Sequence, residues 1–317
     1  MVEVRRREGQ SEMPGTGPMP VLRVAGGQSD SSDEITLEDV DPVGRTEVMI
    51  YGPPGSGKTV LAGTFPPPFR WMDTDKGTKS LKWALKAGKL STRDPKDVVI
   101  FRPSETLDGQ YPSRGRGIIP AFDQMSDKQD FWFSSGEVDK WQTIVVDSFT
   151  EVNEWALNKG LYLNVTLPTK EKPLSTSERV NATAKVRLVT GQQDYKSAMG
   201  LCEGYITDLR IECEKHGKNL VVICHEYTEE REKDDGTMET VRYMPLLIGQ
   251  LRQRMAKSFD DIWYTEMSRG AAGNEVTVLV HEDARHIAKT RWGDILKRTE
   301  PADYRQLIAK VRQYHNG

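Results

Sequence analysis

The sequence has few cysteines, no long apolar run and no strong net charge, and each scarcity excludes a class of protein. Its three cysteines, Cys202, Cys213 and Cys224, have neither metal-site spacing nor an even number for pairing, so we expect reduced thiols in an intracellular protein. No stretch approaches the roughly 18 apolar residues of a membrane span, and the first residues lack the apolar segment of a signal peptide. The net charge is −3, so any nucleic-acid binding must come from a local basic patch.

The chain of 317 residues is long enough for one large domain or two small ones, and its hydrophobic content of 37% allows a sizeable core. Residues 1–34 are rich in Gly, Pro, Ser and charged residues, which predicts a flexible tail. We expect residues 35–300 to form one core and residues 301–317 a closing helix. The apolar face of that helix consists of Tyr304, Leu307, Ile308 and Val311.

Short apolar runs separated by helical patterns predict an α/β fold with a mostly parallel central sheet. The expected strands are 46–51, 69–75, 97–103, 142–148 and 219–226. Apolar residues at helical spacing predict a helix over 194–216, with Cys202 and Cys213 on its core face. After residue 226 the turn signal "DDGT" and the runs "DDIWYTEM", "NEVTVLVHE" and "RHIAKTR" predict an antiparallel extension of the sheet.

The stretch "IYGPPGSGKTVL" fits the phosphate-binding pattern G-x-x-x-x-G-K-[ST] through Gly52, Gly57, Lys58 and Thr59. A β-leaning run precedes it, and a short helix that three prolines would stop follows it. In such a loop backbone N–H groups and the helix dipole attract phosphate. We expect Lys58 to face solvent until it binds the β and γ phosphates of ATP, and Thr59 to bind Mg²⁺. The loop comprises Gly52, Pro53, Pro54, Gly55, Ser56, Gly57, Lys58, Thr59 and Val60.

A nucleotide site of this type needs a second Mg²⁺ ligand and a group that orients or deprotonates the attacking water. Asp147 follows "TIVV" at the end of an expected strand and is the candidate metal ligand. Asp73 and Asp75 end the strand that follows the P-loop helix, and a period of two points them the same way. One of them would lie near the γ-phosphate if their strand neighbours the P-loop strand; the alternative is an Asp-rich turn.

The ordered segments "GPPGSGKT", "MDTDKGT", "IVVDSFTEV" and "NLVVICHE" resemble the ATPase core of RecA-family recombinases. The resemblance implies that Asp75 is the catalytic carboxylate, one methylene shorter than the family's glutamate and followed by an extra residue, Lys76. It also implies that Asp147 belongs to the Mg²⁺ element. A γ-phosphate sensor, usually Gln in the family, is replaced here by His225 or Glu226. Because a phosphate would repel a glutamate, His225 is the favoured candidate.

More narrowly, residues 36–300 resemble short phage-encoded RecA-like ATPases that act as single-strand annealing recombinases, through "QQDYKSAM", "RYMPLLIGQLRQRMAKSFDDIWY" and "AKTRWGD". This likeness implies an ATP- and Mg²⁺-dependent enzyme that acts on single-stranded DNA in recombination or repair, by annealing or strand exchange. It further implies a ring or filament with ATP at subunit interfaces, a single-strand binding protein as a further partner, and a cytoplasmic location. The alternatives are a RecA-like or AAA-type motor for helicase loading or packaging, and a nucleotide switch or kinase.

The same resemblance locates the DNA-binding residues in two loops. The first spans about 158–193 and is locally basic, which suits phosphate contacts without sequence readout. The second loop, "TEEREKDDGTMETVR", is an acidic hairpin, which is a poor binder of phosphate. The helix after it is therefore the better candidate for DNA contacts. The candidate residues are Lys170, Lys172, Arg179, Lys185, Arg187, Arg252 and Arg254.

Two further features concern assembly. Lys289 and Arg291 alternate along an expected late strand, with Asp294 as the nearest acid on that element. In RecA, paired basic residues in a comparable place reach the neighbour's ATP, so the resemblance implies that Lys289 and Arg291 act in trans. The tail segment "PVLRVA" is a candidate anchor to a neighbouring subunit.

Overall fold

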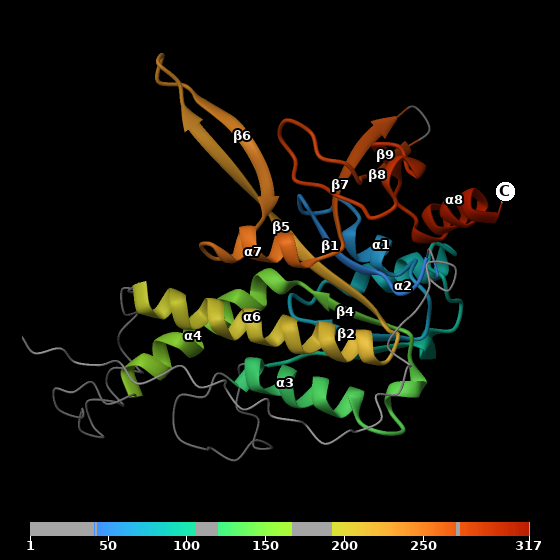
Figure 1. The fold of residues 1–317 in the computed structure, drawn as a ribbon, viewed down its shortest axis with the longest axis horizontal. Coiled ribbons are helices and arrows are strands. Elements are labelled where there is room, and N and C mark those ends of the chain that lie inside the picture. The colour runs from blue at the N-terminus through green and yellow to red at the C-terminus, as the bar shows by residue number, and fades with distance from the viewer. Residues whose placement is uncertain (1–40, 42, 105–119, 167–191, 271–272, 317) are drawn as a thin grey trace, which may run out of the picture. The chain divides into compact units, whose positions relative to one another are not determined.

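The computed structural model describes residues 41, 43–104, 120–166, 192–270 and 273–316 (Figure 1). The chain divides into Met1–Val40 and Asp41–Gly317, and all the described residues belong to the second unit. The predictions for the tail, including the "PVLRVA" anchor, therefore lie outside the described residues.

The described residues form one nine-stranded sheet in the order β3-β2-β4-β5-β1-β7-β8-β9, with β6 paired to β5. The five strands expected from the sequence are β1 (Glu47–Gly52), β2 (Phe69–Asp73), β3 (Val98–Phe101), β4 (Thr143–Asp147) and β5 (Asn219–Glu232). All pairings among these five strands are parallel. This arrangement confirms the predicted α/β fold class.

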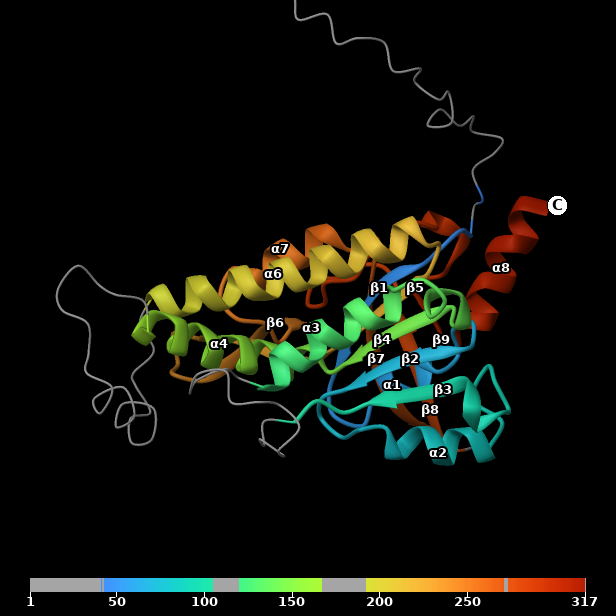
Figure 2. The same ribbon diagram turned by 90° about the horizontal axis from the view of Figure 1, so that it is seen from below.

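Strands β1, β2 and β4 are buried along their whole length because helices cover both faces of the sheet (Figure 2). On one face, Met49 and Val146 pack against the helices α3 (Pro120–Phe133), α4 (Phe149–Thr166) and α6 (Gln192–Lys215). The other face packs against α1 (Lys58–Ala62), α2 (Lys79–Lys86) and α8 (Tyr304–Asn316). Cys202 and Cys213 are buried on the core side of α6, as expected.

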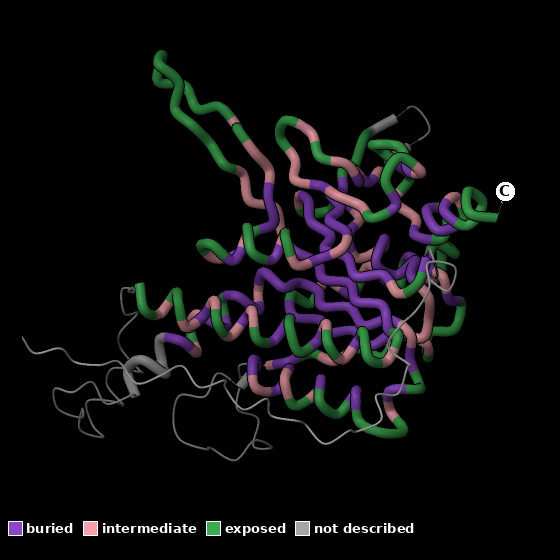
Figure 3. The backbone as a smooth tube through the Cα atoms, in the orientation of Figure 1, coloured by how far each residue is buried: buried purple, intermediate pink, exposed green. Residues whose placement is uncertain are grey.

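The C-terminal strands are β6 (Met238–Pro245), β7 (Asp261–Gly270), β8 (Gly273–Leu279) and β9 (Thr299–Pro301). The pairs β5–β6, β7–β8 and β8–β9 are antiparallel, which confirms the antiparallel extension. The outer part of the β5–β6 hairpin is exposed (Figure 3). The short helix α7 (Leu251–Ser258) follows this hairpin.

Two details of the predicted extension are wrong. Strand β7 runs parallel to β1 and is antiparallel only to β8. The segment "RHIAKTR" is not a strand, because His286 and Lys289 make only isolated bridges, to Tyr243 and Ile262. Because β8 pairs with β7 from Tyr264 onward, only the short stretch of β7 before Tyr264 is free to pair with this segment. There, Ile262 exchanges two backbone hydrogen bonds with Lys289.

The last helix, α8, buries the four apolar residues that the sequence marks. Tyr304 stacks on Phe65 with ring centroids 3.8 Å apart, and its hydroxyl lies 2.7 Å from that of Thr46. These contacts fix the start of α8 beside the end of α1. Among the described helices, none is long and apolar enough to cross a membrane.

Candidate nucleotide-binding site

The P-loop connects β1 to α1 and packs against residues of the strands β7 and β8. A Cβ on Gly52 would lie 2.5 Å from the carbonyl oxygen of Thr265, and one on Gly57 would lie 2.9 Å from Val276. Gly57 caps α1 with a φ of 87°, in the left-handed region that favours glycine. The hydroxyls of Ser56 and Thr265 are 2.6 Å apart. Glycine is therefore required at Gly52 and Gly57 by both space and backbone conformation.

Lys58 does not face solvent, contrary to the expectation from the sequence. Its side chain is buried, and Nζ donates to the carbonyl oxygens of Gly52 and Pro53, each at 2.8 Å. Burial lowers the pKa of Lys58, and Asp147 opposes that effect. In this structure the P-loop itself supplies the hydrogen-bond acceptors of the Lys58 ammonium group. On nucleotide binding, phosphate oxygens would replace these two carbonyl oxygens as acceptors.

Thr59 and Asp147 meet as the sequence predicts for a metal site. The Thr59 hydroxyl donates to Oδ2 of Asp147 at 2.9 Å. Asp147 is 2% exposed, and burial together with the nearby charge of Asp75 raises its pKa to about 7. A buried carboxylate beside a hydroxyl offers the oxygen ligands that Mg²⁺ prefers, and a divalent cation would offset the cost of burying the charge. These residues fit the metal.

Asp73 and Asp75 have different surroundings. Oδ2 of Asp73 accepts hydrogen bonds from Thr78 and from Nε of Arg102, both at 2.6 Å, and the residue is 1% exposed. Asp73 therefore joins β2 to the start of α2 and to the end of β3. The carboxylate of Asp75 instead lies beyond β2 and has Oδ2 3.7 Å from Nε2 of His225.

The route by which Asp75 reaches this place differs from the sequence argument. Strand β2 does not neighbour β1, because β4 and β5 lie between them. Asp75 approaches the P-loop region through the turn after β2, where its Oδ1 accepts from the Gly77 N–H at 2.8 Å. Lys76, the extra residue of the motif, has a φ of 63° in this turn.

The two sensor candidates point to different neighbours. His225 pairs with Gly52 in the sheet register, and its backbone N–H donates to Thr150 Oγ1 at 2.9 Å. Burial lowers the pKa of His225, which favours the neutral imidazole. Burial, aided by the neighbouring Glu226, raises the pKa of Tyr264, and Oε2 of Glu226 is buried with no hydrogen-bond partner among the described residues. The structure thus brings His225, rather than Glu226, to Asp75.

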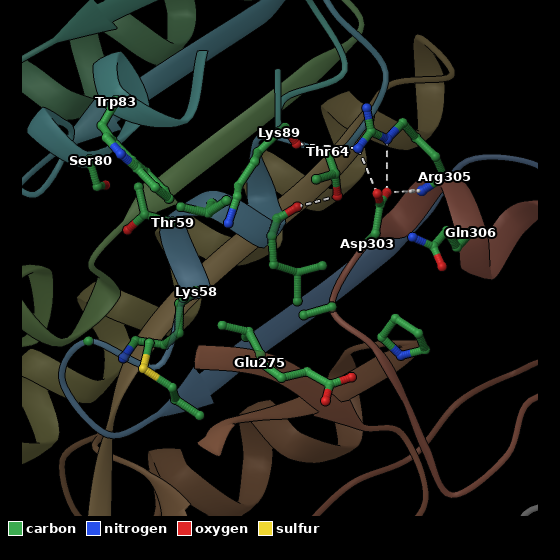
Figure 4. A pocket seen from close by; sticks show the side chains of 18 of the residues that line it. Lys58, Thr59, Thr64, Ser80, Trp83, Lys89, Glu275, Asp303, Arg305 and Gln306 are labelled. Carbon is green, nitrogen blue, oxygen red and sulfur yellow. Dashed lines mark hydrogen bonds and ion pairs between the residues drawn. The ribbon is translucent and has the colours of Figure 1, made fainter. Parts of the chain in front are cut away.

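A cavity of about 900 Å³ extends from the P-loop along α1 (Figure 4). Its volume suits a nucleotide-sized ligand. The wall residues that sequence patterns do not mark include Trp83, Lys89, Glu275, Val276, Asp303, Arg305 and Gln306. Arg305 fixes one wall, because it pairs with Asp303 at 2.6 Å and donates to the carbonyl oxygen of Leu90 at 3.0 Å. No local pattern marks these late residues, although Trp83 stands out as a large apolar residue in a lysine-rich segment.

The candidate DNA-binding residues Lys170, Lys172, Arg179, Lys185 and Arg187 lie outside the described residues. Residues 158–166 belong to α4 rather than to a loop. Arg252 lies over the Tyr227 ring at 3.7 Å, and Arg254 pairs with Glu203 at 2.9 Å. Both arginines are therefore engaged within the chain.

Lys289 and Arg291 lie near two acids that the sequence argument overlooked. The guanidinium of Arg291 is exposed and pairs with Asp260, and its backbone N–H donates to Asp261 at 3.3 Å. Burial lowers the pKa of Lys289, while Asp260 and Asp261 oppose that effect. Within the described part of the chain, these contacts of Arg291 lead to Asp260 and Asp261 and not to the P-loop.

The P-loop after β1 and the buried carboxylate after β4, at one edge of a mostly parallel sheet, form the arrangement of a P-loop nucleotide-binding site. Residues 45–159 match the family model described as an AAA domain, and this segment contains Lys58, Asp75 and Asp147. No curated protein matches the sequence.

Two similar solved structures are archaeal. The flagellar accessory protein FlaH of Methanocaldococcus jannaschii is 9% identical, with 81% of this chain and 87% of that chain covered and a TM-score of 0.37. A KaiC-like protein of Pyrococcus horikoshii is 10% identical, with 77% and 83% covered and a TM-score of 0.35.

Proposed function

We propose that this chain hydrolyses ATP in the P-loop site, and that it does so as an oligomer on single-stranded DNA. The observation that carries the enzymatic part is one convergence: the Thr59–Asp147 pair and the Asp75–His225 pair both lie at the carboxyl ends of the parallel strands, beside Lys58. Open parallel sheets bind ligands at this edge.

The residues divide the reaction among them. Water attacks the γ-phosphorus, the bond from that phosphorus to the β–γ bridging oxygen breaks, and ADP and phosphate leave. Asp75 accepts the proton of the attacking water, Lys58 binds the β and γ phosphates, and neutral His225 donates a hydrogen bond to a phosphate oxygen. Bound Mg²⁺, held by Thr59 and Asp147, would neutralise phosphate charge.

The DNA-dependent part of the proposal rests on the resemblance of the ordered motifs to RecA-like annealing recombinases and on the basic segment around Lys170–Arg187. Annealing or strand exchange during recombination is the task that these features favour. Lys289 and Arg291 are proposed to reach the ATP of a neighbouring subunit, which would make assembly on DNA a condition for fast turnover.

The test is ATP turnover by the purified chain with and without single-stranded DNA. We expect turnover that rises several-fold with DNA and depends on Mg²⁺. Turnover that is unaffected by DNA would keep the ATPase and remove the nucleic-acid role, as expected for a motor with a protein cargo. Nucleotide binding without turnover would instead indicate a switch.

A further inference from the structure

Helix α2 and its flanks carry an unbalanced positive charge. Residues 76–93 contain six basic residues and no acidic one, whereas the whole chain has 44 basic and 47 acidic residues. All six are exposed, and none takes part in an ion pair within the described part of the chain. They are Lys76, Lys79, Lys82, Lys86, Lys89 and Arg93.

These side chains are arranged around one tryptophan. Lys79, Lys82, Trp83 and Lys86 follow the spacing i, i+3, i+4, i+7 and so share one face of α2, which we call the α2 lysine face. The opposite face is buried through Leu81 and Ala84. Nζ of Lys89 lies 4.8 Å from the centre of the Trp83 ring.

Trp83 is exposed to an extent that no other tryptophan approaches. All seven tryptophans lie among the described residues, and Trp83 is 57% exposed while the next most exposed, Trp292, is 8% exposed. The other tryptophans are core residues, so among the tryptophans only Trp83 offers an indole surface to a ligand.

The α2 lysine face works against the stability of its own helix. Like charges at i, i+3 and i, i+4, such as Lys79 with Lys82 and Lys82 with Lys86, repel each other. Lys79 also begins the helix, where the dipole favours acids, and the first turn of α2 contains none. By contrast, Arg254 on α7 and Arg305 on α8 have carboxylate partners. An anionic ligand would remove this repulsion.

We infer that the α2 lysine face binds single-stranded nucleic acid, with the lysines on the phosphates and a base stacked on Trp83. This inference rests on the proposed action on single-stranded DNA and gives that action a surface within the described residues. Cations that follow a backbone, combined with an exposed aromatic ring, are the chemistry of sequence-tolerant single-strand binding. An acidic protein surface would satisfy the lysines but would leave the indole without a matching π-face.

The position of the face couples it to the nucleotide site. Trp83 and Lys89 line the same cavity as Lys58 and Thr59. Thr78, at the start of α2, donates to Asp73 at 2.6 Å, and Asp75 lies in the turn between them. A strand bound along α2 would therefore contact the element that holds the proposed catalytic carboxylate.

The test uses Trp83 as its own reporter, because iodide quenches only accessible tryptophans. In the absence of nucleotide, a short oligodeoxythymidylate should protect the iodide-quenchable fluorescence of the wild-type chain. The triple variant Lys79→Gln/Lys82→Gln/Lys86→Gln should bind the oligonucleotide at least about ten-fold more weakly, with a log–log salt slope reduced by about 2, at roughly 0.7 for each phosphate contact. The matched control Lys196→Gln/Lys215→Gln/Lys297→Gln changes the same charge on exposed sites and should bind normally.

Trp83→Ala should weaken binding by about 5-fold to 150-fold, measured by fluorescence anisotropy of a labelled oligonucleotide, and Trp83→Phe should restore most of it. Unchanged affinity and slope in the triple lysine variant, when the wild type binds DNA, would overturn the inference and leave the proposed function intact. Normal DNA binding by the triple lysine variant together with a changed oligomeric state would overturn the inference in favour of a protein interface. If ATP protects Trp83 from iodide quenching and the oligonucleotide does not, Trp83 belongs to the nucleotide site and the inference is wrong. DNA binding on α2 without any change in ATP turnover would instead contradict the proposed function.

Discussion

Oδ2 of Asp75 lies 3.7 Å from Nε2 of His225, although β4 lies between β2, which precedes Asp75, and β5, which contains His225. The turn after β2 brings a carboxylate, and the point of β5 opposite Gly52 brings a neutral imidazole, to the edge of the sheet where the P-loop begins. In the proposed function, Asp75 accepts the proton of the attacking water and His225 donates a hydrogen bond to the γ-phosphate.

The sensor role can be tested by comparing the two candidates. His225→Ala should lower the turnover number at saturating ATP by about ten-fold or more, because it removes a donor to the transferred phosphate, and His225→Gln should retain more activity. Glu226→Gln should leave turnover within about two-fold, since Glu226 lies beside Tyr264 instead. A large loss with Glu226→Gln and none with His225→Ala would reverse the assignment.

The fit of the P-loop under β7 predicts that even a methyl group is too large at Gly52. Gly52→Ala would place Cβ 2.5 Å from the Thr265 carbonyl oxygen at a φ of 153°, so the loop must shift and lose its affinity for nucleotide. Binding of a fluorescent ATP analogue measures this loss. The control Gly200→Ala lies in α6 with open space around it and should bind normally, with stability equal or higher by up to about 1 kcal/mol. Normal nucleotide binding by Gly52→Ala would contradict the close packing of the loop.

Asp261 predicts a specific dependence of stability on pH. Burial raises its pKa to about 6 from the ordinary aspartate value of about 3.9, so the folded chain binds a proton that the unfolded chain releases between these values. The contribution of Asp261 to stability is therefore fully present below about pH 4 and falls by up to about 3 kcal/mol as the pH rises to 6. Asp261→Asn lacks this loss, so urea unfolding should favour the variant more at pH 7 than at pH 4.5. An equal difference between variant and wild type at both pH values would show that the carboxylate is not protonated in the fold.

The trans role of Arg291 can be separated from a local one by mixing. Arg291→Ala and Lys58→Ala should each be nearly inactive alone. If ATP sits between subunits, a mixture on single-stranded DNA contains interfaces with an intact Lys58 and an intact Arg291, so part of the ATP turnover should return. A mixture as inactive as its components, with both variants shown to co-assemble on DNA, would restrict Arg291 to its local pair with Asp260.

The sequence predicts those parts of the fold that depend on short patterns of neighbouring residues. The P-loop, the apolar runs of β1, β4 and β5, and Asp147 at a strand end all follow from short patterns, because two-sided burial demands continuous apolar residues. The parallel direction of β7 does not, since its pairing with β1 depends on which edge remains free once β5 occupies the other.

In the candidate nucleotide-binding site, too, local patterns identify residues whose roles depend on tertiary contacts. Period-two reasoning treats Asp73 and Asp75 alike, and only the tertiary contact with Arg102 assigns Asp73 to structure and leaves Asp75 beside His225. The burial of Lys58 depends on carbonyls that only the folded loop presents. The walls made by Glu275 and Arg305 come from the opposite end of the chain, where no local pattern distinguishes them from surface residues.

The most direct test of the central claim is single-turnover hydrolysis of prebound ATP by Asp75→Asn. The substitution keeps the size of the side chain and removes its basicity, so the chemical step should slow by about 10² to 10⁴ while ATP affinity stays within a few-fold of wild type. Asp73→Asn is the matched control, and it should lower the melting temperature through its buried contacts with Arg102 and Thr78 while the chemical step stays nearly unchanged. A chemical step at the wild-type rate in Asp75→Asn, or a loss confined to Asp73→Asn, would contradict the account.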